Sequence, residues 1–196
     1  DILEARQDEL AEQLTAELGC PLWFSRAAHV PNPIRHTRFY GEHVTDYPFT
    51  TPWSDGVNRS LVVRHPVGVV AAITPWNGPL SSISMKLAPA LAAGCSVVVK
   101  PPPETPLIPY AFAEAFAEAG LPEGVLSIVP AGREAGQALV DNPGVDKVSF
   151  TGSTAAGKQI LASVSDRVAR ATMELGGKSA AIILPDADLD TVVQRL

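Results

Sequence analysis

The sequence predicts an α/β protein built on a mostly parallel sheet with helices on both faces, preceded by an N-terminal helix and an extended arm. From about residue 66 onward, apolar runs of strand length alternate with helical stretches, an order typical of consecutive βαβ units. Those runs are apolar throughout, as in parallel strands that are covered on both faces. We therefore expect two regions, with the helix and arm in 1–65 and the sheet in 66–196.

The N-terminal region begins with an amphipathic helix. Over residues 1–18, Ile2 and a series of leucines recur at near-helical spacing among acidic residues, and Gly19 follows where a helix would end. From Pro21 to Ser60 the chain is rich in Pro, Thr, aromatic and His residues and shows no sustained period. That composition predicts an extended, irregular arm.

The second region alternates strand and helix in a regular order. The expected elements are a strand at 67–74, a helix at 80–93, a strand at 96–100, a helix at 106–119, a strand at 126–129, a helix at 134–140, a strand at 147–150, a helix at 155–164 and a strand at 180–184. This order predicts a Rossmann-like sheet, whose ligands bind at the carboxyl ends of the strands.

Composition and charge exclude several classes of protein. Hydrophobic residues make up 46% and charged residues 18% of the chain, the balance of a globular protein. The formal net charge is −6 without a dense cluster of Lys or Arg, so we expect no nucleic-acid partner. Apolar runs such as 67–73 are far shorter than the roughly 20 residues that span a bilayer, so we expect no membrane partner. Cys20 and Cys95 form neither a disulfide framework nor a zinc pattern, which favours a reducing cytoplasm.

Polar and turn residues collect where four of the predicted strands end. The segments are 74–78, 100–105, 130–132 and 151–154. Turns recruit Gly, Pro, Asn and Thr for structural reasons alone, so any one segment is explained as a turn. A Trp-Asn pair, a lone Lys and a Gly-Ser-Thr run at neighbouring strand ends favour a shared binding site instead.

The segment Gly152–Lys158 has the features of a phosphate-binding turn. It follows a predicted strand and opens a helix, so its backbone N–H groups and the helix dipole favour an anion. A P-loop needs Ser or Thr after the Lys to hold magnesium, and Gln159 stands there, which makes a P-loop-like NTPase the less favoured interpretation. In a dinucleotide site, Gly152 permits close approach of the backbone and Gly157 permits close packing of the helix.

Three further residues have side chains suited to chemistry at this edge of the sheet. Asn77 is either a turn residue or a donor of amide N–H groups to a developing oxyanion. Lys100 ends an apolar strand, where an ammonium needs solvent or an anionic partner. An isolated Glu is usually a solvated surface charge, but Glu174 lies beside apolar residues and a Gly-Gly turn, a setting that suits a general base.

Together these motifs resemble those of the NAD(P)-dependent aldehyde dehydrogenase superfamily. The resemblance rests on Pro75-Trp76-Asn77, on Lys100 followed by prolines and Thr105-Pro106, on Phe150-Thr151-Gly152-Ser153-Thr154 with Gly157, and on Glu174-Leu175-Gly176-Gly177-Lys178. It is continuous from about Val67 to the end of the chain. Several motifs in register are more specific than a single glycine pattern.

The resemblance implies a role for each matching residue. Asn77 would donate its amide to the thiohemiacetal oxyanion, Glu174 would activate the deacylating water, and Lys100 would bond the adenosine ribose. The other positions implied at the cofactor are Thr74, Pro75, Trp76, Gly136, Phe150, Gly152, Ser153 and Leu175. The implied cofactor is NAD or NADP, and the implied substrate is a small-molecule aldehyde that is oxidised to a carboxylic acid through a cysteine thioester.

Two departures from the family pattern matter. Pro103 replaces a Glu that often grips the ribose hydroxyls in the family, and the loss of that carboxylate lessens repulsion of a 2′-phosphate and leaves NAD or NADP open. The family's nucleophilic Cys would lie past Leu196, and neither Cys20 nor Cys95 matches it. We therefore expect a truncated chain that supplies the cofactor-binding part and is inactive alone, and a homo-oligomer in the complete enzyme.

A second hypothesis comes from a different class of protein. The amphipathic N-terminal helix and an unfinished sheet edge would suit a non-catalytic nucleotide-binding or protein-interaction module. Self-assembly without nucleotide affinity would favour that module, whereas affinity for NAD+ or NADP+ favours the oxidoreductase.

Overall fold

A five-stranded parallel sheet forms the centre of the molecule. The computed structural model describes residues 1–195, and its strands are β3 (Val69–Ile73), β4 (Ser96–Lys100), β5 (Leu126–Ile128), β6 (Lys147–Thr151) and β7 (Arg170–Glu174). They lie in the order β5-β4-β3-β6-β7, and every neighbouring pair is parallel. The chain thus builds outward from β3 in one direction and then from β6 in the other. This doubly wound order confirms the Rossmann-like prediction and places the topological switch point between β3 and β6.

Helices cover both faces of this sheet, as expected. α5 (Pro79–Ala92) and α6 (Tyr110–Glu118) contribute to one buried cluster, while α7 (Arg133–Asp141) and α8 (Thr154–Ser165) contribute to the other. The predicted helices at 80–93, 106–119, 134–140 and 155–164 are therefore confirmed, with ends that move by a few residues at most. Helix boundaries are commonly this variable.

The central strand β3 shows why its sequence is apolar throughout. Val70 and Ala72 face the cluster that contains α5 and α6, whereas Ala71 and Ile73 face the cluster that contains α7 and α8. Successive side chains of a strand point to opposite faces, so a strand buried on both faces has no polar position. The strand therefore holds the two hydrophobic cores together and brings its carboxyl end to the switch point.

The N-terminal helix is confirmed as two consecutive segments. α1 (Ile2–Ala5) and α2 (Gln7–Leu18) precede Gly19, which ends α2 in the left-handed conformation with a φ of 77°. Leu10 and Leu14 are buried in the same cluster as α5 and α6. The amphipathic face thus packs on the body of the protein.

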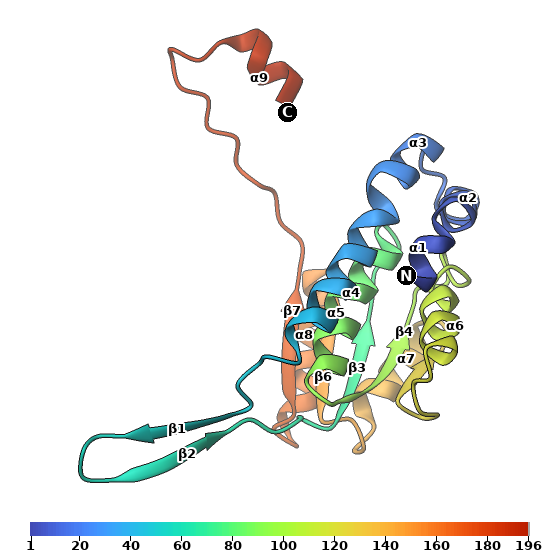
Figure 1. Cartoon of the computed structure of the whole chain (residues 1–196). Helices are drawn as coiled ribbons and strands as arrows, with labels where there is room; N and C mark the ends of the chain where they lie inside the picture. The colour runs from blue at the N-terminus through green and yellow to red at the C-terminus, as the bar shows by residue number, and fades with distance from the viewer. Residues whose placement is uncertain (196) are drawn as a thin grey trace.

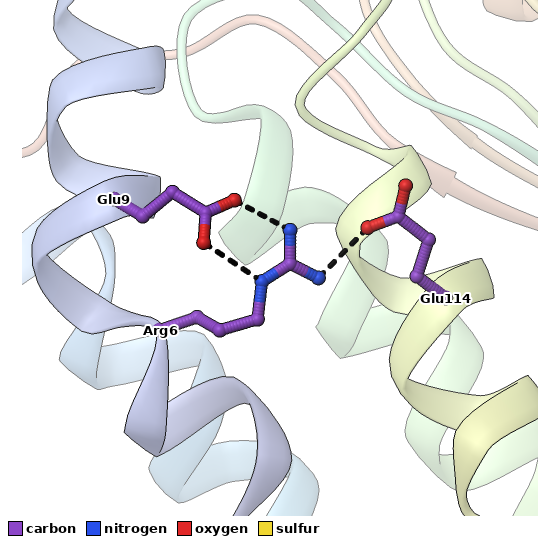
Figure 2. A network of polar contacts seen from close by, with 3 residues as sticks. All are labelled: Arg6, Glu9 and Glu114. Atoms are coloured by element: carbon purple, nitrogen blue, oxygen red, sulfur yellow. Dashed lines mark hydrogen bonds and ion pairs between the residues drawn. The ribbon is translucent and has the colours of Figure 1, made fainter.

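An ion-pair network joins this N-terminal segment to α6. Figure 2 shows the Arg6 guanidinium between Glu9, which follows it on α2, and Glu114 on α6. Its nitrogens lie 2.6 Å from Glu9 Oε1 and 2.7 Å from Glu114 Oε2. These hydrogen bonds raise the pKa of Arg6, but both carboxylates are exposed to water, so the network contributes little to stability.

The prediction of an irregular arm over 21–60 is wrong for its first half. The chain there forms α3 (Leu22–Phe24), a π-helical turn (Ser25–His29) and α4 (Pro31–His43). Prolines obscured the pattern, yet Pro31 and Pro33 lie in the first turn of α4, where a missing N–H costs nothing. Tertiary packing completes the helix, because α4 packs along α5 (Figure 1).

The second half of the arm is an extended hairpin. Strands β1 (Thr50–Ser54) and β2 (Arg59–Val63) pair antiparallel and project away from the sheet (Figure 1). Large apolar side chains, including Trp53 and Leu61, are exposed on it. The expectation of an extended arm is met here by regular strands.

The predicted strand at 180–184 is wrong. Residues 175–184 form neither helix nor strand, and the last strand of the sheet is β7, which sequence patterning did not indicate. β7 is an edge strand that carries Arg, Thr and Glu and alternates between half-buried and exposed positions, so it lacks the uniform apolar run of β3. Beyond it the chain runs away from the body to α9 (Leu189–Arg195), as Figure 1 shows.

No helix within the described residues is long and apolar enough to cross a membrane. The boundary between 1–65 and 66–196 stays a prediction.

Candidate functional site

A cleft of about 370 Å³ lies at the carboxyl ends of the strands around the switch point. Its floor is made by the ends of β3, β4 and β6, and its walls are made by α7 and α8. The lining residues are Ile73, Thr74, Lys100, Pro103, Glu104, Arg133, Gly136, Gln137, Val140, Phe150, Ala156, Gln159 and Ile160. Four residues that the sequence predicts at a cofactor are brought together here: Thr74, Lys100, Gly136 and Phe150. Ligands of doubly wound sheets bind at this position.

Thr74 places a buried hydroxyl group at the end of β3. The residue is 4% exposed, and its Oγ1 atom has no hydrogen-bond partner within the described part of the chain. Buried hydroxyl groups almost always have a partner, and an exception at the floor of a cleft points to a ligand or an ordered water. Thr74 thus fits a bound group with hydrogen-bonding capacity.

Lys100 ends β4 with a buried cation. The residue is 8% exposed, and Nζ donates a hydrogen bond to the carbonyl oxygen of Ala131 at 3.1 Å. Burial lowers the pKa of Lys100, and the negative charge of Glu104 partly opposes that shift. The ammonium has three N–H donors, and one protein acceptor uses one of them. The other donors are available to ribose hydroxyls or a phosphate.

Gly136 leaves room for Lys100 on the wall formed by α7. A Cβ atom at this position would lie 3.3 Å from Cδ of Lys100, tighter than ordinary van der Waals contact. Arg133, Gln137 and Val140 line the cleft from the same helix. The three residues are spaced so that they lie on one face of a helix. That spacing could be seen in and next to the predicted helix at 134–140, but it was not used to predict a binding face.

The other wall is the first turns of α8. Ser153 is the N-cap of this helix, and its Oγ atom accepts a hydrogen bond from the Ala156 N–H at 3.2 Å. Ala156 and Gln159 line the cleft, so the positive end of the helix dipole borders it. Gln159, which argued against a P-loop, is thus a wall residue.

Both glycines of this turn are needed for packing. A Cβ atom at Gly152 would come within 2.5 Å of the Phe150 ring, and one at Gly157 within 2.6 Å of Leu175 Cδ2. The prediction that Gly157 allows close helix packing is therefore confirmed, with Leu175 as the residue that packs against it. Phe150 is buried and lines the cleft, so Gly152 also preserves the floor of the site.

The proposed catalytic residues lie outside the cleft, on the rim of the same sheet edge. Asn77, with Pro75 and Trp76, belongs to the loop between β3 and α5, and Asn77 and Trp76 are exposed. Glu174 is the last residue of β7, its side chain is exposed, and its carbonyl oxygen accepts a hydrogen bond from the Gly152 N–H at 3.0 Å.

Strand register relates the two ends of this rim. Ile73 pairs with Phe150, and Phe150 pairs with Met173, so the residues that follow Ile73 and Met173 leave the sheet at the same level. Two strand spacings separate β3 from β7, which is about 10 Å. A substrate between Asn77 and Glu174 would therefore lie on this rim.

Lys86 is a buried cation that the sequence interpretation missed. It lies on α5, is 8% exposed, and donates a hydrogen bond from Nζ to Ser149 Oγ at 3.3 Å. Burial lowers its pKa, while the charge of Glu174 raises it and the charge of Lys147 lowers it. A Lys within an apolar helix face was the available signal.

Neither cysteine lines the cleft. The Cys20 Sγ atom lies 2.8 Å from Ser25 Oγ, and Cys95 is buried in the core. Within the described residues, no group of three or more His, Cys, Asp or Glu side chains could hold a metal ion.

A doubly wound parallel sheet with a cleft at its switch point, a helix N-terminus on one wall and a buried lysine on the floor is the arrangement of a dinucleotide-binding α/β domain. Comparison with known proteins narrows this class. The model of the aldehyde dehydrogenase family matches residues 1–196, and the chain belongs to that family.

Two curated relatives illustrate the similarity. The chain is 46% identical over 199 residues to geranial dehydrogenase from Castellaniella defragrans, a match that covers 100% of this chain and 41% of that protein. It is 43% identical over 197 residues to a probable NADP(+) succinate-semialdehyde dehydrogenase from Sinorhizobium fredii, covering 98% of this chain and 39% of that protein. The chain therefore spans about two fifths of the length of these relatives.

Solved structures agree with this family membership. An aldehyde dehydrogenase from Mycobacterium tuberculosis, complexed with NAD+, is 45% identical with a TM-score of 0.92, over 96% of this chain and 39% of that one. An aldehyde dehydrogenase from Bacillus cereus in its NAD+ complex is 37% identical with a TM-score of 0.94, over 99% of this chain and 40% of that one.

Proposed function

We propose that this chain is the dinucleotide-binding part of an enzyme that oxidises an aldehyde to a carboxylic acid with NAD+ or NADP+ as the hydride acceptor. The observation that carries the proposal is the cleft at the switch point, which is lined by the buried Lys100 and by Thr74, whose hydroxyl has no hydrogen-bond partner among the described residues. Relatives solved with NAD+ and one named for NADP(+) support either cofactor.

The residues of the cleft fit a dinucleotide from the ribose to the phosphates. Lys100 would donate to the adenosine ribose, and Gly136 keeps the wall beside it open. The turn that contains Gly152 and Ser153 would meet the pyrophosphate, which the N-terminus of α8 favours electrostatically. Trp76, Pro75 and Leu175 border this path from neighbouring loops and complete the proposed cofactor-binding set.

Two rim residues would act on the substrate. The bound nicotinamide ring supplies a hydride acceptor. Asn77 would donate a hydrogen bond from its amide N–H to the oxygen of the reacting carbonyl group. That hydrogen bond would stabilise the negative charge that develops on the oxygen. Glu174 would accept a proton from the water that hydrolyses the acyl group. The position of both residues on one sheet edge supports these roles, whereas the exposed Glu174 side chain lacks the apolar setting that its neighbours in the sequence predicted.

We propose that the chain alone does not oxidise aldehydes. Cys20 and Cys95 lie outside the cleft, so neither thiol is placed to attack a carbonyl beside the cofactor. A mixture of the chain, an aldehyde and NAD+ should produce no NADH absorbance. If the chain does turn over an aldehyde and still does so after both cysteines are replaced by Ser, the reaction does not require a thiol. If replacement of either cysteine abolishes turnover, that thiol takes part in the reaction, which contradicts the proposal.

We further propose that the complete enzyme is a cytoplasmic homo-oligomer. The projecting hairpin supports assembly, because Trp53, Leu61 and Val62 expose apolar surface that a partner would cover. Two free cysteines support a reducing compartment. Sedimentation velocity at several concentrations tests the assembly, and a monomer at every concentration would contradict it.

Titration calorimetry with NAD+ and with NADP+ tests the proposed cofactor site directly. Circular dichroism first establishes that the sample is folded. We expect saturable binding of at least one dinucleotide and no magnesium-dependent binding of ATP. A folded chain that binds neither dinucleotide at millimolar concentration would overturn the proposed function and would favour the protein-interaction module.

A further inference from the structure

The cleft carries charges of both signs around the position proposed for the ribose. Its charged lining residues are Lys100, Glu104 and Arg133. Lys100 is buried and held by the Ala131 carbonyl oxygen, whereas Glu104 and Arg133 are exposed. The ammonium of Lys100 therefore has a fixed place, and the two exposed side chains decide which further charge the site tolerates.

Glu104 lines the same cleft as Lys100 and follows it by four residues in the chain. The next residue, Thr105, is 1% exposed, and the N–H groups of Leu107 and Ile108 donate to the Glu17 carboxylate at 2.8 and 2.9 Å. The backbone on the far side of Glu104 is thus anchored to the body of the protein. The negative charge of Glu104 partly opposes the lowering of the Lys100 pKa by burial.

Resting on the proposed function, we propose that Glu104 makes this cleft prefer NAD+ to NADP+. The ribose of NAD+ presents two neighbouring hydroxyl groups, which donate hydrogen bonds to a carboxylate such as that of Glu104. A 2′-phosphate replaces one of these donors and adds a charge of about −1.5 to −2. The carboxylate missing at Pro103 is therefore supplied by the neighbouring residue, which lines the same cleft.

Arg133 does not cancel this preference. It is the first residue of α7, and its side chain is exposed. Glu104 and Arg133 are both exposed and screened by water, but the long Arg133 side chain also loses entropy when it is fixed on a phosphate, whereas the backbone that follows Glu104 is anchored. Glu104 lies beside the buried Lys100, which is the group that reaches the ribose in the proposed site.

The test compares dissociation constants for NAD+ and NADP+ in three variants of the chain, measured by calorimetry at one ionic strength. The variants are Glu104→Gln, Arg133→Gln and Glu123→Gln, the last an exposed carboxylate outside the cleft that serves as the control. We expect the original chain to bind NAD+ the more tightly. Glu104→Gln should tighten NADP+ binding about tenfold and change NAD+ binding by less than about threefold, because it removes one repulsive charge.

Each outcome decides the inference. An NADP+ to NAD+ ratio of dissociation constants that is the same in Glu104→Gln and Glu123→Gln would overturn the role of Glu104 while leaving the proposed function intact. A shift toward still tighter NAD+ in Glu104→Gln, or an original chain that prefers NADP+ because of Arg133, would overturn it as well. Failure of the original chain to bind either dinucleotide would overturn the proposed function itself and the inference with it.

Discussion

Replacement of Lys100 by Met should weaken cofactor binding while it leaves the stability of the fold nearly unchanged. Met keeps the length and much of the apolar stem of Lys, so the end of β4 should pack as before. The substitution removes an ammonium that is 8% exposed and whose pKa is lowered by burial. The acceptor left behind is the carbonyl oxygen of Ala131, a half-buried residue, so water can replace the ammonium as its donor. We therefore expect the free energy of unfolding to change by no more than about 1 kcal/mol.

The cofactor should respond much more strongly. A hydrogen bond from a charged donor is worth about 1.5–3 kcal/mol, and each 1.4 kcal/mol is a factor of about ten, so Lys100→Met should weaken NAD+ binding about 10- to 100-fold. Calorimetry measures the dissociation constant, and urea unfolding measures the stability of the same samples. Arg59→Met is the control, because Arg59 is an exposed cation on β2 and does not line the cleft. Equal NAD+ affinity in Lys100→Met and Arg59→Met would refute the assignment of Lys100 to the cofactor.

Three further substitutions test the packing and electrostatics around the site. Gly152→Ala would place a Cβ atom within 2.5 Å of the buried Phe150 ring, so it should destabilise the fold by about 1–3 kcal/mol and weaken nucleotide binding; unchanged melting and affinity would contradict this packing. Gly68→Ala should lower the free energy of unfolding by at least about 2 kcal/mol, measured in urea, because the φ of Gly68 is 112°. The new Cβ atom would also overlap the Asp146 carboxylate, which accepts a hydrogen bond from the Val69 N–H at 2.8 Å. In the folded chain burial lowers the pKa of Lys86 below its unfolded value of 10.5, so the charged form opposes folding and stability should rise as the pH increases through the folded pKa. Lys86→Met should therefore raise the free energy of unfolding near neutral pH and flatten its alkaline pH dependence, and a variant with the same pH profile as the original chain would show that Lys86 is not desolvated.

The predictions from sequence were wrong where tertiary contacts determine the secondary structure. Residues 31–43 contain two prolines and a mixed composition, and only their position in the first helical turn and the packing of α4 on α5 make this segment a helix. Residues 180–184 are as apolar as a buried strand, but within the described residues they pair with no strand, because the chain runs away from the sheet after β7 (Figure 1). β7 itself was overlooked because its residues alternate between half-buried and exposed positions and form no continuous apolar run.

By itself the sequence determined the alternation of strand and helix, the two-sided burial of β3, and the strand ends at which Thr74 and Lys100 lie, because each of these follows from local periodicity and from where apolar runs stop. Only the tertiary structure decided which strand ends meet. Strand order depends on long-range pairing, which placed β3 and β6 side by side and gathered residues as distant as Thr74, Glu104, Arg133 and Gln159 around one cleft. The exposed or buried state of each of those side chains, and with it their charge and hydrogen-bonding capacity, is a property of that assembly and of no segment alone.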